Sequence, residues 1–225
     1  AIVPRTPRTI LERFQRSLNS SPDTAAPVFG RDDEILDAAT ALLSSARRHI
    51  PLITGPSGSG KSTVLRGVAE FMERNRPDRR VIGLHLNELV VGVTYEGEFE
   101  NIFAQFVREA EAKPGTILAV EHFELLAMGR TARLLCQALD RGSLSMVGAI
   151  SDELFERIRA PLRRRVLPVR LRPMPQVALR ELLRYEVKRL SELYELDIAL
   201  RMADVCCRAA EKLPGGSPDR ELTLL

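Results

Sequence analysis

Eight consecutive residues, G-P-S-G-S-G-K-S at positions 55–62, have the types and spacing needed to bind the phosphates of a nucleotide. They fit the pattern G-x-x-x-x-G-K-[ST], in which the glycines allow a tight loop whose backbone N–H groups surround phosphate oxygens. We expect Lys61 to reach the β- and γ-phosphates and the Ser62 hydroxyl to bind Mg²⁺. The residues expected to contact the nucleotide are Gly55, Pro56, Ser57, Gly58, Ser59, Gly60, Lys61, Ser62 and Thr63.

The surroundings of this loop are those that the pattern requires. An apolar run at Ile50–Thr54 precedes the loop and a helical pattern at Val64–Met72 follows it, so that the loop joins a strand to a helix. The N-terminus of that helix adds partial positive charge, which attracts phosphate. The sequence contains no N-K-x-D guanine motif and no transporter-type L-S-G-G-Q motif, which favours ATP as the nucleotide.

Short apolar segments alternate with helical patterns along most of the chain. The alternation predicts an α/β fold with a parallel sheet covered by helices on both faces, as in a P-loop NTPase. We expect a linker with a short helix (Ile10–Leu18) in residues 1–27, a nucleotide-binding domain in 28–172, and an incomplete helical lid in 173–225. The expected strands are 50–54, 81–86, 116–120, 144–150 and 166–171, and the expected later helices are 99–112, 132–139, 177–193 and 198–213.

The charge is small in total but unevenly distributed. The chain has 33 basic and 30 acidic residues, a net charge of +3, yet residues 157–189 hold 11 basic and only 2 acidic residues. Such a basic stretch can face nucleic acid, phosphate or an acidic protein surface. Basic residues are not interleaved with aromatic ones in the way that nucleic-acid binding favours, so we do not expect a nucleic-acid partner.

Composition excludes several other classes of protein. Hydrophobic residues make up 44% and charged residues 28% of the chain, which are globular values. No apolar run approaches the roughly 20 residues of a membrane-spanning helix, and residues 1–9 lack the apolar core of a signal peptide. The three cysteines lack the spacing of a zinc site and are expected to be reduced thiols. We therefore expect a cytoplasmic protein that does not enter a membrane.

Further segments give the chain a specific resemblance. They are P-V-F-G-R-D at 27–32, G-V-T-Y-E-G-E-F-E at 92–100, A-L-D-R-G-S-L at 138–144, V-G-A at 147–149, L-R-R-R at 162–165 and S-P-D-R at 217–220. In their order and spacing they are similar to motifs in the first ATPase ring of the Clp/heat-shock protein unfoldases (the ClpA, ClpB and ClpC group). From about residue 11 to residue 225, the chain resembles that family, which belongs to the AAA+ class.

The resemblance implies roles for residues outside the phosphate loop. Val28 and Phe29 would lie beside the adenine, and Tyr95 would be the pore-loop aromatic that grips an extended polypeptide substrate. Arg164 and Arg165 match the arginine finger, which reaches the γ-phosphate in the next subunit. The family therefore implies a ring-type homo-oligomer, expected to be a hexamer. The family's basic neighbours of the pore aromatic are replaced here by Thr94 and Glu96.

The next family motif, an apolar strand ending in Asp-Glu, is altered. In the ungapped register Glu121 takes the place of the magnesium-ordering Asp, and His122 that of the catalytic Glu. A shift by one residue would instead make Glu121 the base and leave Val120 at the metal position. In both registers one carboxylate is missing, and imidazole is a poor substitute because it is partly protonated near neutral pH. Ser151 replaces a family Thr as the expected polar contact to the γ-phosphate.

Two classes of function remain open. One is an ATP-binding AAA+ module of a protein-remodelling or unfoldase ring, with weak or absent hydrolysis at this site. The other is a non-enzymatic module in which ATP holds subunits together. A third, a DNA-remodelling loader, rests mainly on the basic stretch. We interpret that stretch as one side of a head-to-tail contact, since the remaining residues carry a net −6 and would supply the complement.

Overall fold

The computed structural model describes residues 27–44, 49–84, 86, 97–195, 197–199, 201–210 and 217–225, together with the backbone of residues 15–16. In chain order the strands are β1 (Gln15–Arg16), β2 (Ile50–Gly55), β3 (Arg80–Leu84), β4 (Thr116–Val120), β5 (Ser145–Ser151) and β6 (Val166–Arg170). The helices are α2 (Asp32–Leu43), α3 (Lys61–Asn75), α5 (Glu98–Glu111), the 3₁₀ turn η1 (Phe123–Leu125), α6 (Gly129–Arg141), α7 (Asp152–Phe155), α8 (Ala160–Arg163), α9 (Gln176–Tyr194), α10 (Met202–Ala210) and α11 (Asp219–Leu222).

The strands form one sheet in the order β1-β3-β4-β5-β2-β6. All neighbouring pairs are parallel except the short β1, which pairs antiparallel with β3 at one edge. The register places Gly55 at the end of β2 opposite Ser151 at the end of β5. The carboxyl ends of the central strands therefore meet at one edge of the sheet, which is where open α/β sheets bind their ligands.

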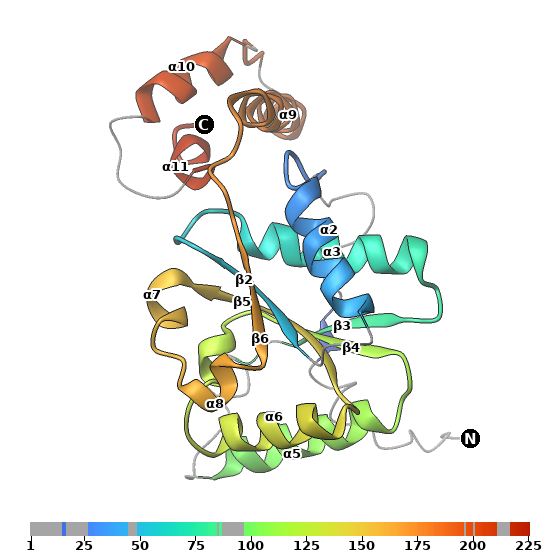
Figure 1. The fold of residues 1–225 in the computed structure, drawn as a ribbon. Coiled ribbons are helices and arrows are strands. Elements are labelled where there is room, and N and C mark those ends of the chain that lie inside the picture. Colours follow the sequence, from blue (N-terminus) through green and yellow to red (C-terminus); the bar gives the residue numbers. More distant parts are fainter. Residues whose placement is uncertain are drawn as a thin grey trace, which may run out of the picture.

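Helices cover both faces of the sheet, so the predicted architecture is confirmed (Figure 1). Helices α2 and α3 pack on one face, where their apolar side chains meet Ile53, Ile117 and Val147 of the strands. Helices α5 and α6 cover the other face. In α6, Leu135, Ala138 and Leu139 are buried at a spacing that puts them on a single side of the helix. Arg130, Arg133 and Arg141 of the same helix are exposed to solvent.

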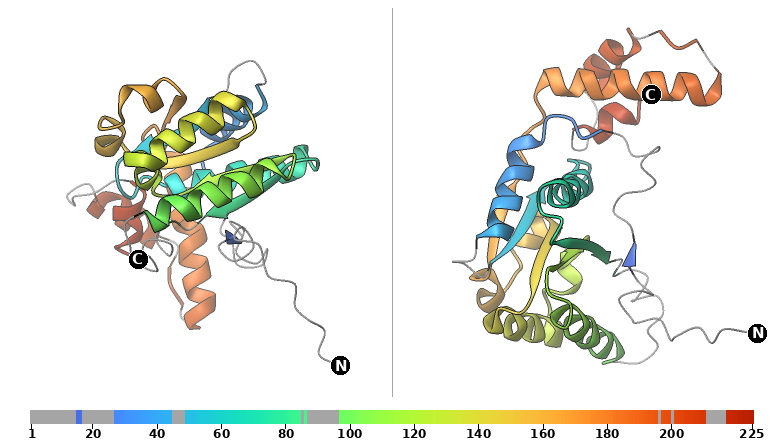
Figure 2. Two further views of the ribbon diagram at one scale, coloured as in Figure 1. Left: turned by 90° about the horizontal axis from the view of Figure 1, so that it is seen from below. Right: turned by 90° about the vertical axis from the view of Figure 1, so that its right-hand side faces the viewer.

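Helices α9, α10 and α11 form a smaller assembly beyond the carboxyl edge of the sheet (Figure 2, right). Its core contains Leu179 and Leu183 of α9 together with Ala203 and Cys206 of α10. Residues 171–175 connect β6 to α9 without regular structure. Within the described residues, no helix is both long enough and apolar enough to cross a membrane.

Two expectations about individual elements were wrong. Gln15 and Arg16 form a strand where a helix was expected, because they pair with the edge of β3, a contact far away in the sequence; the rest of 10–18 lies outside the described residues. Helix α10 begins at Met202 rather than at Ile198. The N–H of Ile198 instead donates a hydrogen bond to the Ser191 hydroxyl, 3.4 Å away, and a turn precedes the helix.

Candidate nucleotide-binding site

The phosphate loop leaves the buried strand β2 at Gly55 and enters helix α3 at Lys61. The first N–H groups of a helix have no partner within the helix, so those of α3 are available at the end of the loop. The Lys61 ammonium donates hydrogen bonds to the carbonyl oxygens of Gly55 at 3.1 Å and Pro56 at 2.7 Å. The loop therefore brings a positive charge and backbone donors together, as phosphate binding requires.

The environment of Lys61 perturbs its titration. Partial burial lowers the pKa of the Lys61 ammonium, and the negative charges of Asp152 and Glu124 act in the opposite direction. Burial penalises the charged form because the ammonium loses part of its hydration. Both carboxylates come from segments that follow strands of the sheet, so Lys61 lies at the edge where these strands end.

A cavity of about 180 Å³ lies against this loop. It brings together side chains from the phosphate loop, the segment after β4 and the end of β5, all at the carboxyl edge of the sheet. Its polar lining consists of Ser57, Lys61, Ser62, Glu121, His122, Glu124 and Ser151. The residues expected around the γ-phosphate, which are distant in the sequence, thus share one cavity.

The altered acidic motif has a distinctive local geometry. Glu121 follows β4 directly, and His122 adopts a left-handed backbone conformation with a φ of 56°. The Nδ1 atom of His122 lies 3.1 Å from Oε1 of Glu124, and the His122 side chain is 54% exposed. The imidazole, which the ungapped register puts at the family's catalytic position, is therefore engaged by a carboxylate of its own chain.

Glu124 is held in the cavity by its neighbour Phe123. Phe123 is fully buried and packs against Gly148 of β5, where a Cβ atom would lie only 2.8 Å from the Phe123 ring. A side chain at position 148 would therefore displace the ring. Because Phe123 anchors η1, the next residue is presented to the cavity that Lys61 also lines.

These residues fit a nucleotide with magnesium. The Ser62 hydroxyl is exposed and Glu121 lines the same cavity, which gives Mg²⁺ two oxygen donors of the kind it prefers. Within the described residues, no group of three or more His, Cys, Asp or Glu side chains is arranged to hold a metal ion. Magnesium at phosphate sites commonly takes its remaining ligands from phosphate oxygens and water.

Comparison with known proteins identifies the family. A family model described as an AAA ATPase domain matches residues 27–195. The chain belongs to the AAA ATPase family. The match covers β2, α3 and the segments after β4 and β5 that line the cavity at the phosphate loop, and membership of this family implies nucleotide binding.

Individual relatives of this AAA ATPase domain belong to the Clp group. The chain is 30% identical over 205 residues to the ATP-dependent Clp protease ATP-binding subunit ClpC of Staphylococcus aureus (strain USA300) and to that of Staphylococcus epidermidis (strain ATCC 12228 / FDA PCI 1200). Each alignment covers 84% of this chain. The chain spans only 24% of the length of these relatives.

Solved structures show the same fold. An S. cerevisiae Hsp104–ADP complex matches 95% of this chain with a TM-score of 0.84 at 21% sequence identity. An extended S. cerevisiae Hsp104:casein complex matches the same share with a TM-score of 0.79 at 23% identity. In both cases the match covers 40% of the Hsp104 chain. The chain is thus a Clp/Hsp100-like AAA+ module, as its sequence motifs had suggested.

The residues expected beside the adenine lie between the sheet and the C-terminal helices of the AAA ATPase domain. Val28 and Phe29 are partly buried just before α2. The ring of Phe29 lies 5.8 Å from the ring of Tyr185 in α9, with the planes tilted by 52°. An adenine ring held next to Phe29 would therefore contact both the nucleotide-binding domain and helix α9.

The arginines at the expected finger positions have different environments. Arg165 binds Asp140 of its own chain through two hydrogen bonds, whereas Arg164 is exposed and pairs with no carboxylate of the described part of the chain. Arg163 contacts Glu156 and lies over the ring of Phe155. Of the two predicted finger residues, Arg164 is the one whose guanidinium makes no ion pair with the described part of the chain.

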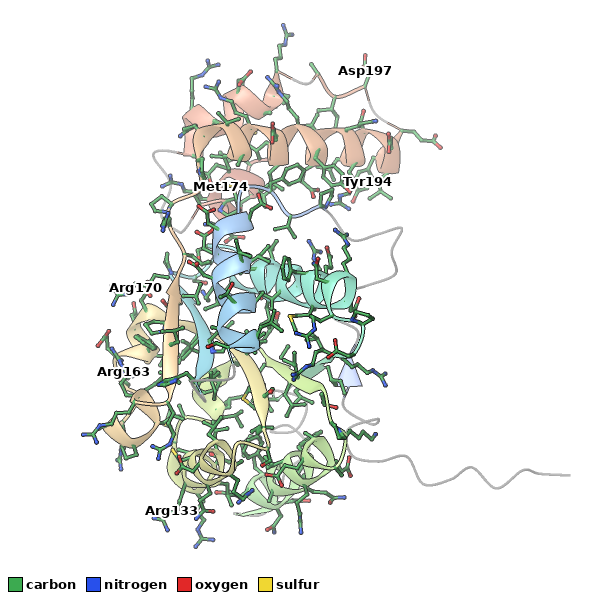
Figure 3. The ribbon with its side chains drawn as sticks, turned by 45° about the vertical axis from the view of Figure 1, so that its right-hand side comes forward. Arg133, Arg163, Arg170, Met174, Tyr194 and Asp197 are labelled. Carbon is green, nitrogen blue, oxygen red and sulfur yellow. The ribbon has the colours of Figure 1, made fainter. Side chains whose placement is uncertain are left out.

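Several arginines near α8 form a basic surface. Arg130 and Arg133 of α6, together with Arg159, line a pocket of about 470 Å³ whose floor includes Ala132 and Leu162. We call Arg130, Arg133, Arg159 and Arg164 the α6/α8 arginine surface. Arg133, Arg163 and Arg170 lie along the same side of the molecule (Figure 3). Part of the basic stretch is compensated within the chain, since Arg165, Arg172 and Arg180 pair with acidic residues outside it.

The structure also adds residues that sequence reasoning missed. The guanidinium of the buried Arg31 donates a hydrogen bond to the carbonyl oxygen of Ser59. The backbone N–H of Asp219 donates to the carbonyl oxygen of Gly58 at 3.3 Å. Both residues therefore contact the phosphate loop. The motifs G-R-D and S-P-D-R had marked the segments of Arg31 and Asp219, but not these contacts. The predicted pore residue Tyr95 lies outside the described residues.

Proposed function

We propose that this chain is the ATP-binding AAA+ module of a Clp-like protein-remodelling ring and that its own site hydrolyses ATP slowly or not at all. The observation that carries the proposal is the cavity that Lys61 and Ser62 share with Glu121 and His122. Ring assembly and action on polypeptides are part of the proposal, because the chain spans only a fraction of its relatives' length.

Each residue of the cavity has a definite part in this proposal. Lys61 and the N–H groups of the loop would hold the phosphates, while Ser62 and Glu121 would hold Mg²⁺, which would supply positive charge beside the phosphates. Ser151 can donate its hydroxyl proton to the γ-phosphate, since its oxygen accepts the N–H of Leu154 at 3.4 Å. His122 leaves the attacking water without a carboxylate base.

A steady-state ATPase assay, combined with titration calorimetry of ATP and ADP, tests the proposal. We expect saturable nucleotide binding that Lys61→Ala abolishes, and turnover about 10²–10⁴-fold below that of a site with a well-placed base. Hydrolysis at ordinary unfoldase rates would overturn the inactive-site part of the proposal. Absence of nucleotide binding in the folded wild-type protein would overturn all of it.

A second candidate function is a nucleotide-dependent scaffold without activity of its own. The exposed Arg164 favours it, because a guanidinium that reaches a neighbour's phosphates can hold a ring together without hydrolysis. Sedimentation with ATP, ADP and no nucleotide, combined with an assay of substrate remodelling, separates the two functions. The scaffold requires assembly that ATP promotes while polypeptide substrates remain unaltered, whereas a motor requires remodelling of a substrate.

A further inference from the structure

The side chain of Arg31 is buried at the junction of three segments. Only 1% of this residue is exposed, although it carries a charge. Its guanidinium donates hydrogen bonds to the carbonyl oxygen of Ser59 at 2.9 Å and to that of Arg172 at 2.6 Å. A third contact, at 3.3 Å, reaches Oε1 of Glu34, which supplies the opposite charge.

The contact with Ser59 fixes the orientation of a peptide group in the phosphate loop. In a trans peptide the C=O and the following N–H point in opposite directions. Because Arg31 holds the Ser59 carbonyl on the buried side, the N–H of Gly60 points away from Arg31. Ser57 and Lys61, which flank this peptide group in the loop, line the cavity. Arg31 therefore fixes the direction of a backbone donor next to the place expected for the phosphates.

The same ion pair holds the segment that leads to α9. Arg31 binds the carbonyl oxygen of Arg172, and the backbone N–H of Arg172 donates to Oε1 of Glu34 at 3.2 Å. The Arg31–Glu34 pair therefore binds both the backbone C=O and the backbone N–H of Arg172, which lies in the connecting segment 171–175. The phosphate loop and the connection to the C-terminal helices have a common anchor.

Arginine has the shape that this junction needs. A guanidinium is planar, stays charged and carries donors that diverge, so it can bind two carbonyl groups and a carboxylate at once. Burying such a cation is unfavourable unless it is paired, and Nε of Arg31 has no hydrogen-bond partner within the described structure. A buried ion pair such as Arg31–Glu34 often gives no more stability than two well-packed apolar residues of similar volume in place of both partners.

We infer that Arg31 is a positioning residue for nucleotide binding: it orients the Gly60 N–H toward the phosphates and ties the phosphate loop to the connecting segment through Glu34 and Arg172. This inference rests on the proposed nucleotide-binding function. Glu34 acts with Arg31 by neutralising it and by holding the N–H of Arg172.

The test compares the affinity for ADP of Arg31→Lys with that of Met72→Ala, both measured by calorimetry on folded protein. Met72 is fully buried on α3, far along the helix from the phosphate loop, so its variant loses stability without losing the contact to Ser59. We expect Arg31→Lys to bind ADP about tenfold or more weakly, since a lysine cannot keep the fork of hydrogen bonds. Met72→Ala should bind within twofold of wild type.

Equal ADP affinities in the two variants would overturn the inference and leave Arg31 a purely structural residue. If Arg31→Lys does not fold, Glu34→Gln provides the measurement, because it keeps Arg31 but removes its counter-charge. For Glu34→Gln we expect weaker ADP binding and faster hydrogen exchange at the Arg172 amide. Unchanged values of both would overturn the inference. Failure of the wild type to bind ADP would instead refute the proposed function.

Discussion

Arg165 and Asp140 form a two-pronged ion pair within one subunit, with Nε–Oδ1 and Nη2–Oδ2 distances of 2.8 Å each. The pair ties the end of α8 to α6, and Asp140 raises the pKa of the Arg165 guanidinium through this hydrogen bonding. Arg165 is therefore committed to its own chain. The neighbouring Arg164 projects from a segment that this pair holds in place.

Arg164→Ala is expected to abolish ATP-promoted assembly without changing thermal stability. Removing an exposed guanidinium costs the folded monomer little, but a neighbouring subunit would lose a charge beside its phosphates. Sedimentation velocity with and without ATP measures the first effect and thermal denaturation the second.

Arg165→Ala is the matched variant for this experiment. It should lower the free energy of unfolding by about 0.5–1 kcal/mol, because it removes a well-formed surface pair. Its assembly should persist at concentrations where Arg164→Ala stays monomeric. If only Arg165→Ala lost assembly, the finger would be Arg165, and its pairing with Asp140 would have to open.

His122→Glu is expected to increase ATP turnover by about 10–100-fold, because it restores a carboxylate at the family's base position. His122→Ala serves as the control, since it removes the imidazole and its contact with Glu124 without adding a base. The shifted alignment makes a different prediction, namely that Val120→Asp and not His122→Glu restores turnover. A steady-state assay of the three variants therefore decides the register. If none of them hydrolyses ATP faster than wild type, the altered motif is not what limits hydrolysis.

The sequence predicts best those features that depend on neighbouring residues. Strand β4 has the predicted bounds, Thr116–Val120, because a turn precedes it and four consecutive apolar residues follow Thr116. The phosphate loop was recognisable because glycines and a lysine at fixed spacing leave few alternatives. Local patterns of this kind needed no knowledge of the tertiary structure.

Features that depend on distant contacts escaped prediction. The pairing of Gln15 with Leu84 turns a helical pattern into an edge strand. The burial of Arg31 depends on partners at positions 59 and 172, which no local pattern around Arg31 reveals. Glu124 reaches the cavity only because Phe123 packs against Gly148. In each case the deciding partner lies more than 20 residues away.

The affinity for ADP should fall at alkaline pH, and the fall should begin below the usual pKa of lysine. Burial lowers the pKa of Lys61, and only the protonated ammonium attracts phosphate. Lys61→Arg should remove this decline, since a guanidinium remains protonated throughout. Calorimetric titration from pH 7 upward measures both proteins.

The stability of the nucleotide-free protein should change in the opposite sense. Because the folded-state pKa of Lys61 lies below its unfolded value, the unfolded chain binds more protons between the two values. The contribution of Lys61 to stability therefore increases as pH rises through that window.

The affinity measurement has a clear contrary outcome. A wild-type affinity for ADP that stayed constant as pH rose, or that declined in parallel with that of Lys61→Arg, would show that Lys61 is not the group that titrates.

Gly58→Ala is expected to destabilise the protein more than Gly129→Ala, although both glycines have a left-handed backbone, with φ values of 73° and 59°. A Cβ atom on Gly58 would overlap that of Asp219 in α11, whereas one on Gly129 meets no described atom within 4 Å. The backbone penalty of about 1–2 kcal/mol is common to both variants. The contact with Asp219 should add about 1–3 kcal/mol to Gly58→Ala alone.

Combining Gly58→Ala with Asp219→Gly isolates this contact, because the second change removes the atom that the new methyl group would overlap. Urea unfolding of the single and double variants gives the interaction energy. We expect the double variant to be more stable than the sum of the two single effects predicts. Its total loss of stability should equal the loss in Gly129→Ala plus the loss in Asp219→Gly alone. Strictly additive effects would mean that α11 does not rest on the phosphate loop in solution. A recovery would show that the C-terminal helices and the nucleotide loop are packed against each other before nucleotide binds.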